Sequence, residues 1–316
     1  MFLSQLSWRC CAFWEKIAEF SGRHPIAPSF VNLYTINTGF FKLDGGAMFG
    51  VVPQSLWKNL NPPDANNMCT WAMRCLLIED NGRTVLIDNG IGDKQGEKFF
   101  RHYYLHGDDS LMGSLRATGI GPGEITDMFL THLHFDHCGG GVRRAGEGYE
   151  LVFPKAQYWT NAAHWQWATA PNPRERASFL VENLAPVHDS GQLLHVPLPT
   201  GGQASTSVPF LPQVELMVVD GHTEQQMLPL IHFKGHKILF CGDLFPSAGH
   251  LPIAYVMAYD VRPLQAMHEK EAILQRAAAE DWLLFFEHDP IHECCSLQST
   301  ERGIRPKEFL RLADLS

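Results

Sequence analysis

The sequence predicts a domain of the α/β class with α+β character, in which sheets and helices pack as layers around a shared core. Three observations lead to this expectation. Short apolar segments bounded by Gly, Pro, Asn or Asp alternate with segments of helical periodicity. The chain has 316 residues and is 45% hydrophobic, enough to bury one large core or two modest ones. Several of the expected strands also end directly in His or Asp residues.

The composition narrows the classes of partner. The net charge is −9 and no basic run is longer than a dipeptide, which argues against nucleic acid and against an anionic membrane surface. No apolar stretch of about 18 residues is present, so no transmembrane helix is expected. The eight cysteines include adjacent pairs at 10–11 and 294–295, a poor framework for disulfides. We therefore expect a cytoplasmic protein that acts on a small-molecule substrate.

Residues 1–29 are expected to form an N-terminal helical extension. Apolar side chains recur there at spacings of three and four, as on one face of a helix: Leu6, Cys10, Phe13, Ile17 and Phe20. Charged residues at positions 15, 16 and 19 interrupt any signal-peptide core. Two interpretations remain open. The helix packs on its own domain, or it is an arm that covers a partner subunit in a homodimer.

The first half of the remaining chain shows the patterns of strands, hairpins and short helices. A turn separates strands at 31–38 and 40–43, and a loop rich in Pro, Asn and Trp follows at 53–68. Strands at 71–79 and 83–88 form a hairpin around Asp80-Asn81-Gly82. The later segments are a helix at 110–118, a strand at 125–131, a strand at 157–159, helices near 162–168 and 174–184, and a strand at 193–196.

The second half repeats the alternation. A loop of Gly, Ser, Thr and Pro at 199–209 marks the midpoint. A strand at 214–219 precedes a hairpin at 228–233 and 236–240, and a last strand is expected at 282–286. Pro263 opens a helix that runs to about residue 279. Its expected buried face carries Leu264, Met267, Leu274 and Ala278.

The segment from Thr131 to Gly141, THLHFDHCGGG, is the most distinctive part of the chain. His132 and His134 are two residues apart, so on an extended chain they point the same way. Asp136 and His137 fall where the strand gives way to a loop and can face a second point, and the triple glycine lets the backbone turn sharply. Imidazole and carboxylate groups are ligands that zinc takes at sites open to water. The alternative is a chance cluster in a chain with 16 histidines.

Three further side chains share the same setting. His222, Asp243 and His288 each stand just after an apolar strand. Loops at strand ends are where α/β folds gather functional groups. Taken singly, His222 or His288 would be interpreted as an ordinary packing residue. Taken together and in this order, the three favour a metal site shared with the first cluster.

These residues resemble the complete ligand set of the metallo-β-lactamase superfamily, over about residues 30–290. The resemblance implies a catalytic domain at 30–316 with the metallo-β-lactamase αββα sandwich. It also implies two Zn²⁺ ions, or other divalent metals, at the sheet edges. The implied first metal is held by His132, His134 and His222, the second by Asp136, His137 and His288, and Asp243 bridges them.

The chemistry implied by this resemblance is hydrolysis. Two metals about 3.5–4 Å apart can share a hydroxide whose pKa is lowered towards neutrality, and they can polarise a carbonyl or phosphoryl oxygen. Asp136 and Asp243 are therefore the expected catalytic carboxylates. No Ser or Cys nucleophile is needed, and Cys138 is interpreted as a neighbour of the ligands.

Other residues indicate the branch of the superfamily. The flavodiiron branch carries Glu where this chain has His134, and true β-lactamases carry Cys where it has Asp243. Asn37-Thr38-Gly39, which leads into Lys42-Leu43-Asp44-Gly45, is similar to the N-acyl homoserine lactonases and the methyl parathion hydrolase group. One departure is Pro246, because lactonases commonly have Tyr at that position.

The substrate pocket is harder to predict. Trp57, Phe245, Tyr255 and Met257 are expected to border the metals and to line an apolar acyl or aryl pocket, although each could equally pack in the core. The expected function is hydrolysis of a lactone or an ester, most specifically an acyl homoserine lactone, which is a quorum-quenching reaction. The alternatives are a phosphotriesterase or arylesterase and, from another class, a catalytically silent metal-binding scaffold. The complete set of seven ligands argues against the scaffold.

Overall fold

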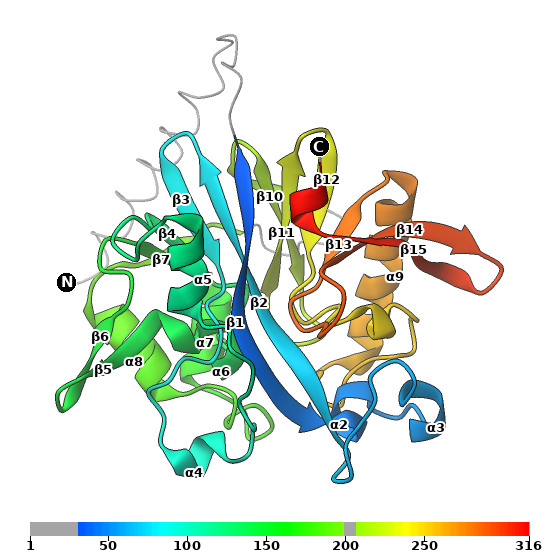
Figure 1. Cartoon of the computed structure of the whole chain (residues 1–316), viewed down its shortest axis with the longest axis horizontal. Coiled ribbons are helices and arrows are strands. Elements are labelled where there is room, and N and C mark those ends of the chain that lie inside the picture. Colours follow the sequence, from blue (N-terminus) through cyan, green and yellow to red (C-terminus); the bar gives the residue numbers. More distant parts are fainter. Residues whose placement is uncertain (1–30, 199–206, 316) are drawn as a thin grey trace, which may run out of the picture.

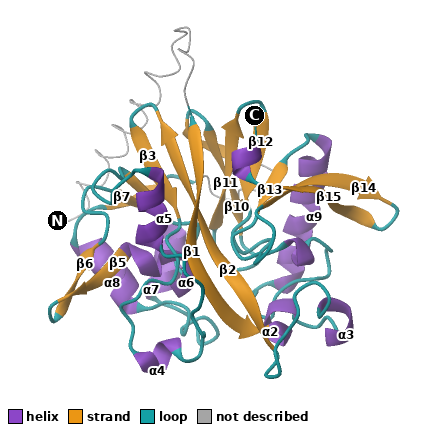
Figure 2. Cartoon of the chain, in the orientation of Figure 1, coloured by secondary structure: helices purple, strands orange, loops and turns teal. Residues whose placement is uncertain are grey.

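The computed structural model describes residues 31–198 and 207–315, and within them most strands belong to two large sheets (Figures 1 and 2). The first sheet has six strands. In spatial order they are β1 (Asn32–Asp44), β2 (Met68–Asp80), β3 (Arg83–Ile87), β4 (Asp127–Phe129), β7 (Gln157–Asn161) and β8 (Leu193–Val196). A separate small hairpin pairs β5 (Val142–Ala145) with β6 (Gly148–Leu151).

The second sheet has seven strands. In spatial order they are β15 (Gly303–Leu310), β14 (Cys294–Thr300), β13 (Leu283–Phe285), β12 (His236–Phe240), β11 (Gln226–Phe233), β10 (Val214–Val219) and β9 (Ser207–Leu211). The strands predicted at 193–196, 214–219 and 236–240 are confirmed residue for residue. The β14–β15 and β5–β6 hairpins were not predicted. Part of the predicted midpoint loop is strand β9, and residues 199–206 lie outside the described part.

The helices lie on the outer sides of the two sheets or in their connecting loops (Figure 2). The longest are α5 (Leu111–Thr118), α7 (Ala162–Thr169), α8 (Val181–Asp189) and α9 (Pro263–Ala279), and the shorter ones are α2 (Gly45–Phe49), α3 (Gln54–Trp57), α4 (Glu97–Phe100) and α6 (Phe135–Cys138). None of the described helices combines the length and the apolar character that crossing a bilayer requires. The predicted N-terminal extension lies outside the described residues.

Successive side chains along the strands of each sheet pack into two different cores, one on each face of the sheet. Leu76 and Ile78 of β2 pack in the core between the sheets, whereas Leu77 packs under the helices α5, α7 and α8. In the second sheet Ile231 packs between the sheets and Leu230 packs under α9. The four layers are therefore helix, sheet, sheet and helix. The predicted αββα sandwich is confirmed.

Three details of the expected secondary structure are wrong. The two strands expected at 31–43 are one long strand, β1, with a bulge between Asn37 and Phe40 where Gly39 takes a φ of 107°. The helix expected near 174–184 begins later, because α8 starts at Val181. Helix α9 has the predicted bounds and buries Leu274 as expected, but the rest of its buried face is formed by Ala266, Glu269, Lys270, Ile273 and Ala277, and Leu264 is exposed.

Candidate metal centre

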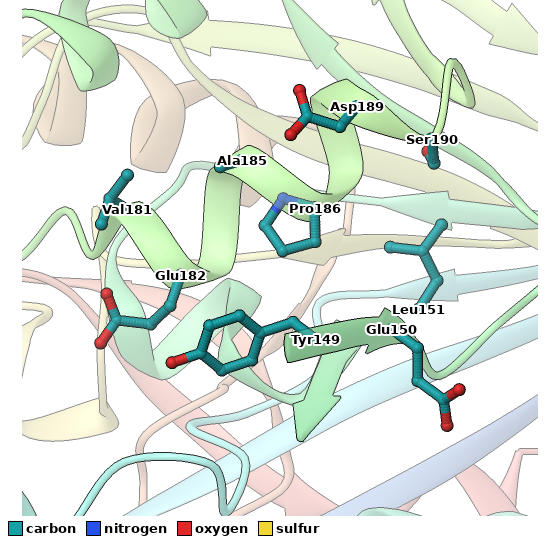
Figure 3. A pocket seen from close by; sticks show the side chains of 9 residues that line it. All are labelled: Tyr149, Glu150, Leu151, Val181, Glu182, Ala185, Pro186, Asp189 and Ser190. Atoms are coloured by element: carbon teal, nitrogen blue, oxygen red, sulfur yellow. The ribbon is translucent and has the colours of Figure 1, made fainter. Parts of the chain in front are cut away.

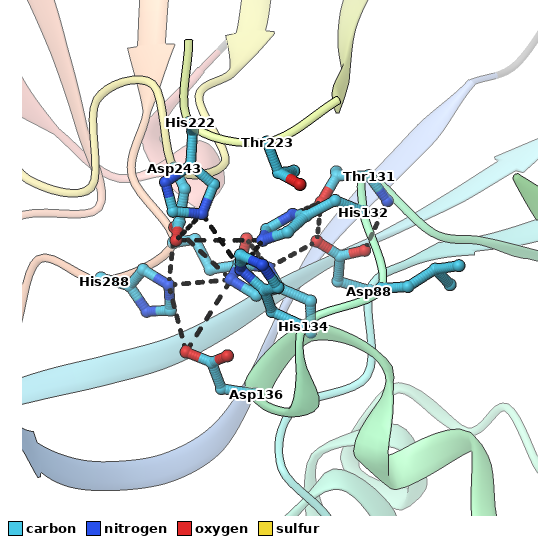
Figure 4. Close-up of polar contacts among 12 residues, drawn as sticks. Asp88, Thr131, His132, His134, Asp136, His222, Thr223, Asp243 and His288 are labelled. Carbon is cyan, nitrogen blue, oxygen red and sulfur yellow. Dashed lines mark hydrogen bonds and ion pairs between the residues drawn. The ribbon is translucent and has the colours of Figure 1, made fainter. Parts of the chain in front are cut away.

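The seven predicted ligands meet in one place, at loops that follow strands of both sheets (Figure 4). The loop after β4 brings His132 and His134, and α6 brings Asp136 and His137. The loops after β10, β12 and β13 bring His222, Asp243 and His288. All seven residues are buried, none more than 8% exposed. The structure thus brings the seven predicted residues together at one point.

The backbone around the ligands explains how the loops are positioned. Helix α6 begins after His134, whose carbonyl accepts the backbone N–H groups of His137 and Cys138. The loop that carries His222 packs against the start of α9, so closely that a Cβ at Gly221 would lie 2.4 Å from the Ala266 backbone. The His288 N–H donates to the Pro246 carbonyl at 3.0 Å, which joins two of the ligand-bearing loops.

The first ligand set consists of His132, His134, His222 and one oxygen of Asp243, with all four ligand atoms within 4.8 Å of one another. His134 Nδ1 lies 3.1 Å from the Nε2 atoms of both His132 and His222. Asp243 Oδ2 lies 3.1 Å from His222 Nε2. Three ring nitrogens and a carboxylate oxygen that face one point form a donor set suited to zinc.

The second set consists of Asp136, His137 and His288, again within 4.8 Å of one another. The Nε2 atoms of His137 and His288 lie 3.2 Å apart. Asp243 Oδ1 lies 2.9 Å from His288 Nε2 and 3.4 Å from His137 Nε2. Asp243 therefore faces the first set with one carboxylate oxygen and the second set with the other.

The opposite ring nitrogen of most ligand histidines has a polar partner. His137 Nδ1 lies 3.0 Å from Asp88 Oδ2, His222 Nδ1 lies 2.9 Å from Asp260 Oδ1, and His288 Nδ1 lies 2.8 Å from the Ala72 carbonyl oxygen. A partner of this kind places the ring proton away from the ligand nitrogen and orients the ring. Each of these histidines thus presents Nε2 to the centre of the site.

The electrostatics of the site follow from burial and from a few carboxylates. Burial acts to lower the pKa of His288, but Asp243 outweighs it and raises that pKa to about 9. Burial acts to raise the pKa of Asp243, but His137, His288 and His222 hold it well below its usual range. Burial raises the pKa of the neighbouring Glu287 to about 8. A proton and a metal ion therefore compete for the same ligand nitrogens.

The residues present fit a pair of divalent metals. Asp243 Oδ1 is buried without an aligned hydrogen-bond donor, although two imidazoles lie within 3.4 Å of it. Close nitrogen pairs that cannot all donate to one another are expected where ring lone pairs converge on a metal. Imidazole and carboxylate donors together favour zinc over magnesium or calcium.

The four predicted pocket residues are placed differently from one another. Trp57 and Phe245 are no more than 1% exposed and pack in the core, where Trp57 stacks on Phe49 at a centroid distance of 5.1 Å. Met257 is 3% exposed in the same cluster as Trp57, and Tyr255 is half-buried at its edge. The core-packing alternative therefore describes Trp57 and Phe245 better than the pocket does.

A groove on the surface lies away from this chemistry. It has a volume of about 660 Å³ and runs along α8, and none of the seven ligands lines it (Figure 3). Its wall includes Tyr149, Val181 and Pro186. We assign it no part in the metal centre.

Four buried carboxylates around the ligands were not predicted: Asp88, Glu175, Asp260 and Glu287. Asp88 and Glu287 could have been found, since Asp88 ends the strand expected at 83–88 and Glu287 directly follows the strand expected at 282–286. Glu287 Oε2 lies 3.1 Å from His137 Nδ1. Glu175 and Asp260 lie in loops with no local pattern that marks them.

Comparison with known proteins agrees with the fold. Residues 74–288 match the family described as the metallo-beta-lactamase superfamily. A probable metallo-hydrolase from Mycobacterium tuberculosis is 26% identical over 276 residues, which cover 77% of this chain and 85% of that protein.

Solved structures give the same result. A probable metal-dependent hydrolase from Staphylococcus aureus superimposes with a TM-score of 0.77 at 26% identity, covering 89% of this chain and 98% of that one. AidC, a dizinc quorum-quenching lactonase, superimposes with a TM-score of 0.71 at 19% identity, covering 89% of this chain and 96% of that one. At that identity the second likeness shows the fold alone.

Proposed function

The chain belongs to the metallo-beta-lactamase superfamily and is a hydrolase of that family, and from this premise we propose that it is a dinuclear zinc enzyme that opens a lactone or an ester. The observation that carries the proposal is Asp243, whose two oxygens face different ligand sets. A carboxylate placed between two sets of imidazoles is suited to bind both members of a metal pair. The most specific substrate class that we propose is N-acyl homoserine lactones.

The residues would divide the work as follows. His132, His134 and His222 would hold one metal, Asp136, His137 and His288 the other, and Asp243 both. When bound, the metals would supply a nucleophile from water near neutral pH and polarise the substrate carbonyl. The burial of all seven ligands keeps bulk water away, which strengthens every charge interaction in the site.

An aromatic cluster beside the ligands supports an apolar substrate. Phe135 stands between two ligands in the sequence, and its ring lies 4.8 Å from Tyr103 and 5.4 Å from Phe99, both half-buried. Burial and then Asp136 raise the pKa of Tyr103 to about 12, so its hydroxyl keeps its proton at neutral pH. We propose that these rings bind an acyl chain and that Tyr103 can donate a hydrogen bond to the lactone. Pro246, at the position where lactonases commonly have Tyr, offers no hydroxyl.

The metal content is the first expected result. Protein purified without chelator should contain two zinc ions per chain, because the ligands divide into two sets around Asp243. Elemental analysis measures this directly, and dialysis against a chelator should remove both the zinc and the hydrolytic activity. One metal per chain, or activity that survives complete removal of zinc, would contradict the dinuclear proposal. A protein that holds two zinc ions but cleaves none of the esters below would be a catalytically silent scaffold.

The choice of substrate is the second expected result. Each buried CH₂ of an acyl chain contributes about 0.8 kcal/mol, so kcat/KM should rise with acyl length across a series of homoserine lactones until the pocket is filled. Ring opening can be followed by pH-monitored assay, beside an aryl phosphotriester and an aryl ester. Slow opening at every acyl length, with fast cleavage of the phosphotriester or the aryl ester, would replace the lactonase assignment with the phosphotriesterase or arylesterase alternative.

A further inference from the structure

Two buried carboxylates outside the ligand set stand behind the histidines of the first metal. Glu175 is 3% exposed and Asp260 is 4% exposed. Asp260 Oδ1 lies 2.9 Å from His222 Nδ1. Glu175 Oε1 lies 3.4 Å from His134 Nε2, a nitrogen with no aligned hydrogen-bond partner among the described residues. Glu175 is therefore the acceptor within reach when His134 presents Nδ1 to a metal.

Further hydrogen bonds hold both carboxylates in place. Glu175 Oε1 accepts from the Thr223 hydroxyl at 2.7 Å, and Oε2 accepts from Trp167 Nε1 at 2.7 Å and from Asn172 Nδ2 at 2.6 Å. Asp260 Oδ2 accepts from the Met257 backbone N–H at 3.0 Å. Neither carboxylate can turn away from its histidine without breaking these bonds.

The two carboxylates lie on different loops, and one arginine joins them. Glu175 lies between α7 and α8, and Asp260 lies just before α9. Arg174 Nη2 donates to the backbone carbonyls of Ala258 and Asp260, the latter at 3.1 Å. Because Arg174 is the neighbour of Glu175 in the chain, its side chain connects the loop behind His134 to the loop behind His222.

The second set is supported differently. Behind His137 stand Asp88, just after β3, and Glu287, just after β13, and behind His288 stands the carbonyl of Ala72 in β2. Each of these three partners lies in a strand of one of the two sheets or within two residues of its end. The first set thus depends on two loops for the orientation of His134 and His222, whereas the second set depends on the two sheets.

We propose that Glu175 and Asp260 are positioning residues for the first metal, and that the Arg174 bridge sets the affinity of that metal by keeping the two loops together. The inference rests on the proposed dinuclear centre. An acceptor behind a ligand histidine orients the ring and raises its basicity, and loss of such a partner typically lowers metal affinity by about 10–100-fold. A movement of either loop would therefore lower the affinity for the first metal and not the affinity for the second.

The test uses the full chain stripped of metal and titrated with zinc against a competing chelator. Glu175→Gln, Asp260→Asn and Arg174→Met are each expected to weaken one of the two stepwise zinc affinities by about 10-fold or more and to leave the other unchanged. Arg176→Met is the matched control, because Arg176 is an exposed arginine on the same loop and its change removes the same charge. Arg174→Lys, which keeps a donor for the two carbonyls, should recover part of the affinity.

The outcomes separate the inference from the proposed function. Wild-type protein that binds fewer than two zinc ions would overturn the proposed function, and the inference with it. The inference alone would be overturned if the wild-type protein binds two zinc ions but the variants keep both zinc affinities, or lose both to the same extent. The thermal midpoint of the metal-free variants identifies general unfolding, because a positioning role leaves it close to that of the wild type while the zinc affinity falls.

Discussion

Replacing Asp243 with alanine is expected to remove nearly all hydrolytic activity. The change deletes the one side chain that faces both ligand sets and leaves the imidazoles of His222 and His288 without the carboxylate that lies 3.1 and 2.9 Å from them. Loss of a residue behind a ligand costs about 10–100-fold, so loss of the shared ligand should lower kcat/KM by more than about 100-fold. Zinc per chain should fall below two in the same preparation.

The control for this variant is Asp108→Ala, which removes an exposed aspartate far from the metal centre in the sequence. It should keep its zinc and its activity. An Asp243→Ala protein with two zinc ions and nearly wild-type turnover would show that the two metals do not depend on a shared carboxylate.

Gly140→Ala is expected to lower the free energy of unfolding of the protein substantially. A Cβ at this position would lie 2.0 Å from the Asn89 carbonyl oxygen, and the backbone there cannot retreat because the Gly140 N–H donates to the Gly90 carbonyl at 2.9 Å. Overpacking in a well-packed core typically costs about 1–3 kcal/mol. The upper end of that range or more is expected here, since the closest contact is with the Asn89 backbone and not with the end of a flexible side chain.

The measurement is the free energy of unfolding in urea, taken with and without zinc. Gly123→Ala provides the control, because a Cβ there would meet nothing within 4 Å. Since Gly140 lies two residues beyond the ligand helix α6, the variant should also lose zinc affinity. Equal stabilities for the two variants would mean that the loop at 89–91 moves aside freely.

The sequence was most informative where ligands follow strands. Each of His222, Asp243 and His288 stands three residues beyond the end of an apolar strand, and a strand end is a local pattern that a sequence displays. The triple glycine has a different role from the sharp turn that its composition predicts. Residues 139–141 form a short 3₁₀ turn, and glycine is needed at Gly139 and Gly140 because their backbone lies against the loop at 89–91.

The features that the sequence does not predict correctly share a physical cause, because each depends on contacts between residues that are distant in the sequence. The helix expected to start at residue 174 is displaced because Glu175 turns inward to Thr223 and His134, while Arg174 reaches the loop at 258–260. Trp57 ends the short helix α3 and Phe245 stands two residues after Asp243, but tertiary packing buries both side chains. The β14–β15 hairpin is largely exposed, so its side chains show no alternation that would have revealed it.

The order of the strands has a consequence for dividing the protein. Residues 32–196 build the whole first sheet and residues 207–310 the whole second sheet, so a cut between residues 198 and 207 leaves each sheet in one piece. Each piece would carry two ligands for each metal: His132 and His134 against His222 and Asp243 in one set, Asp136 and His137 against His288 and Asp243 in the other. Two such fragments, expressed separately, would acquire a tight zinc site only by pairing with each other, so zinc uptake would report their reassembly.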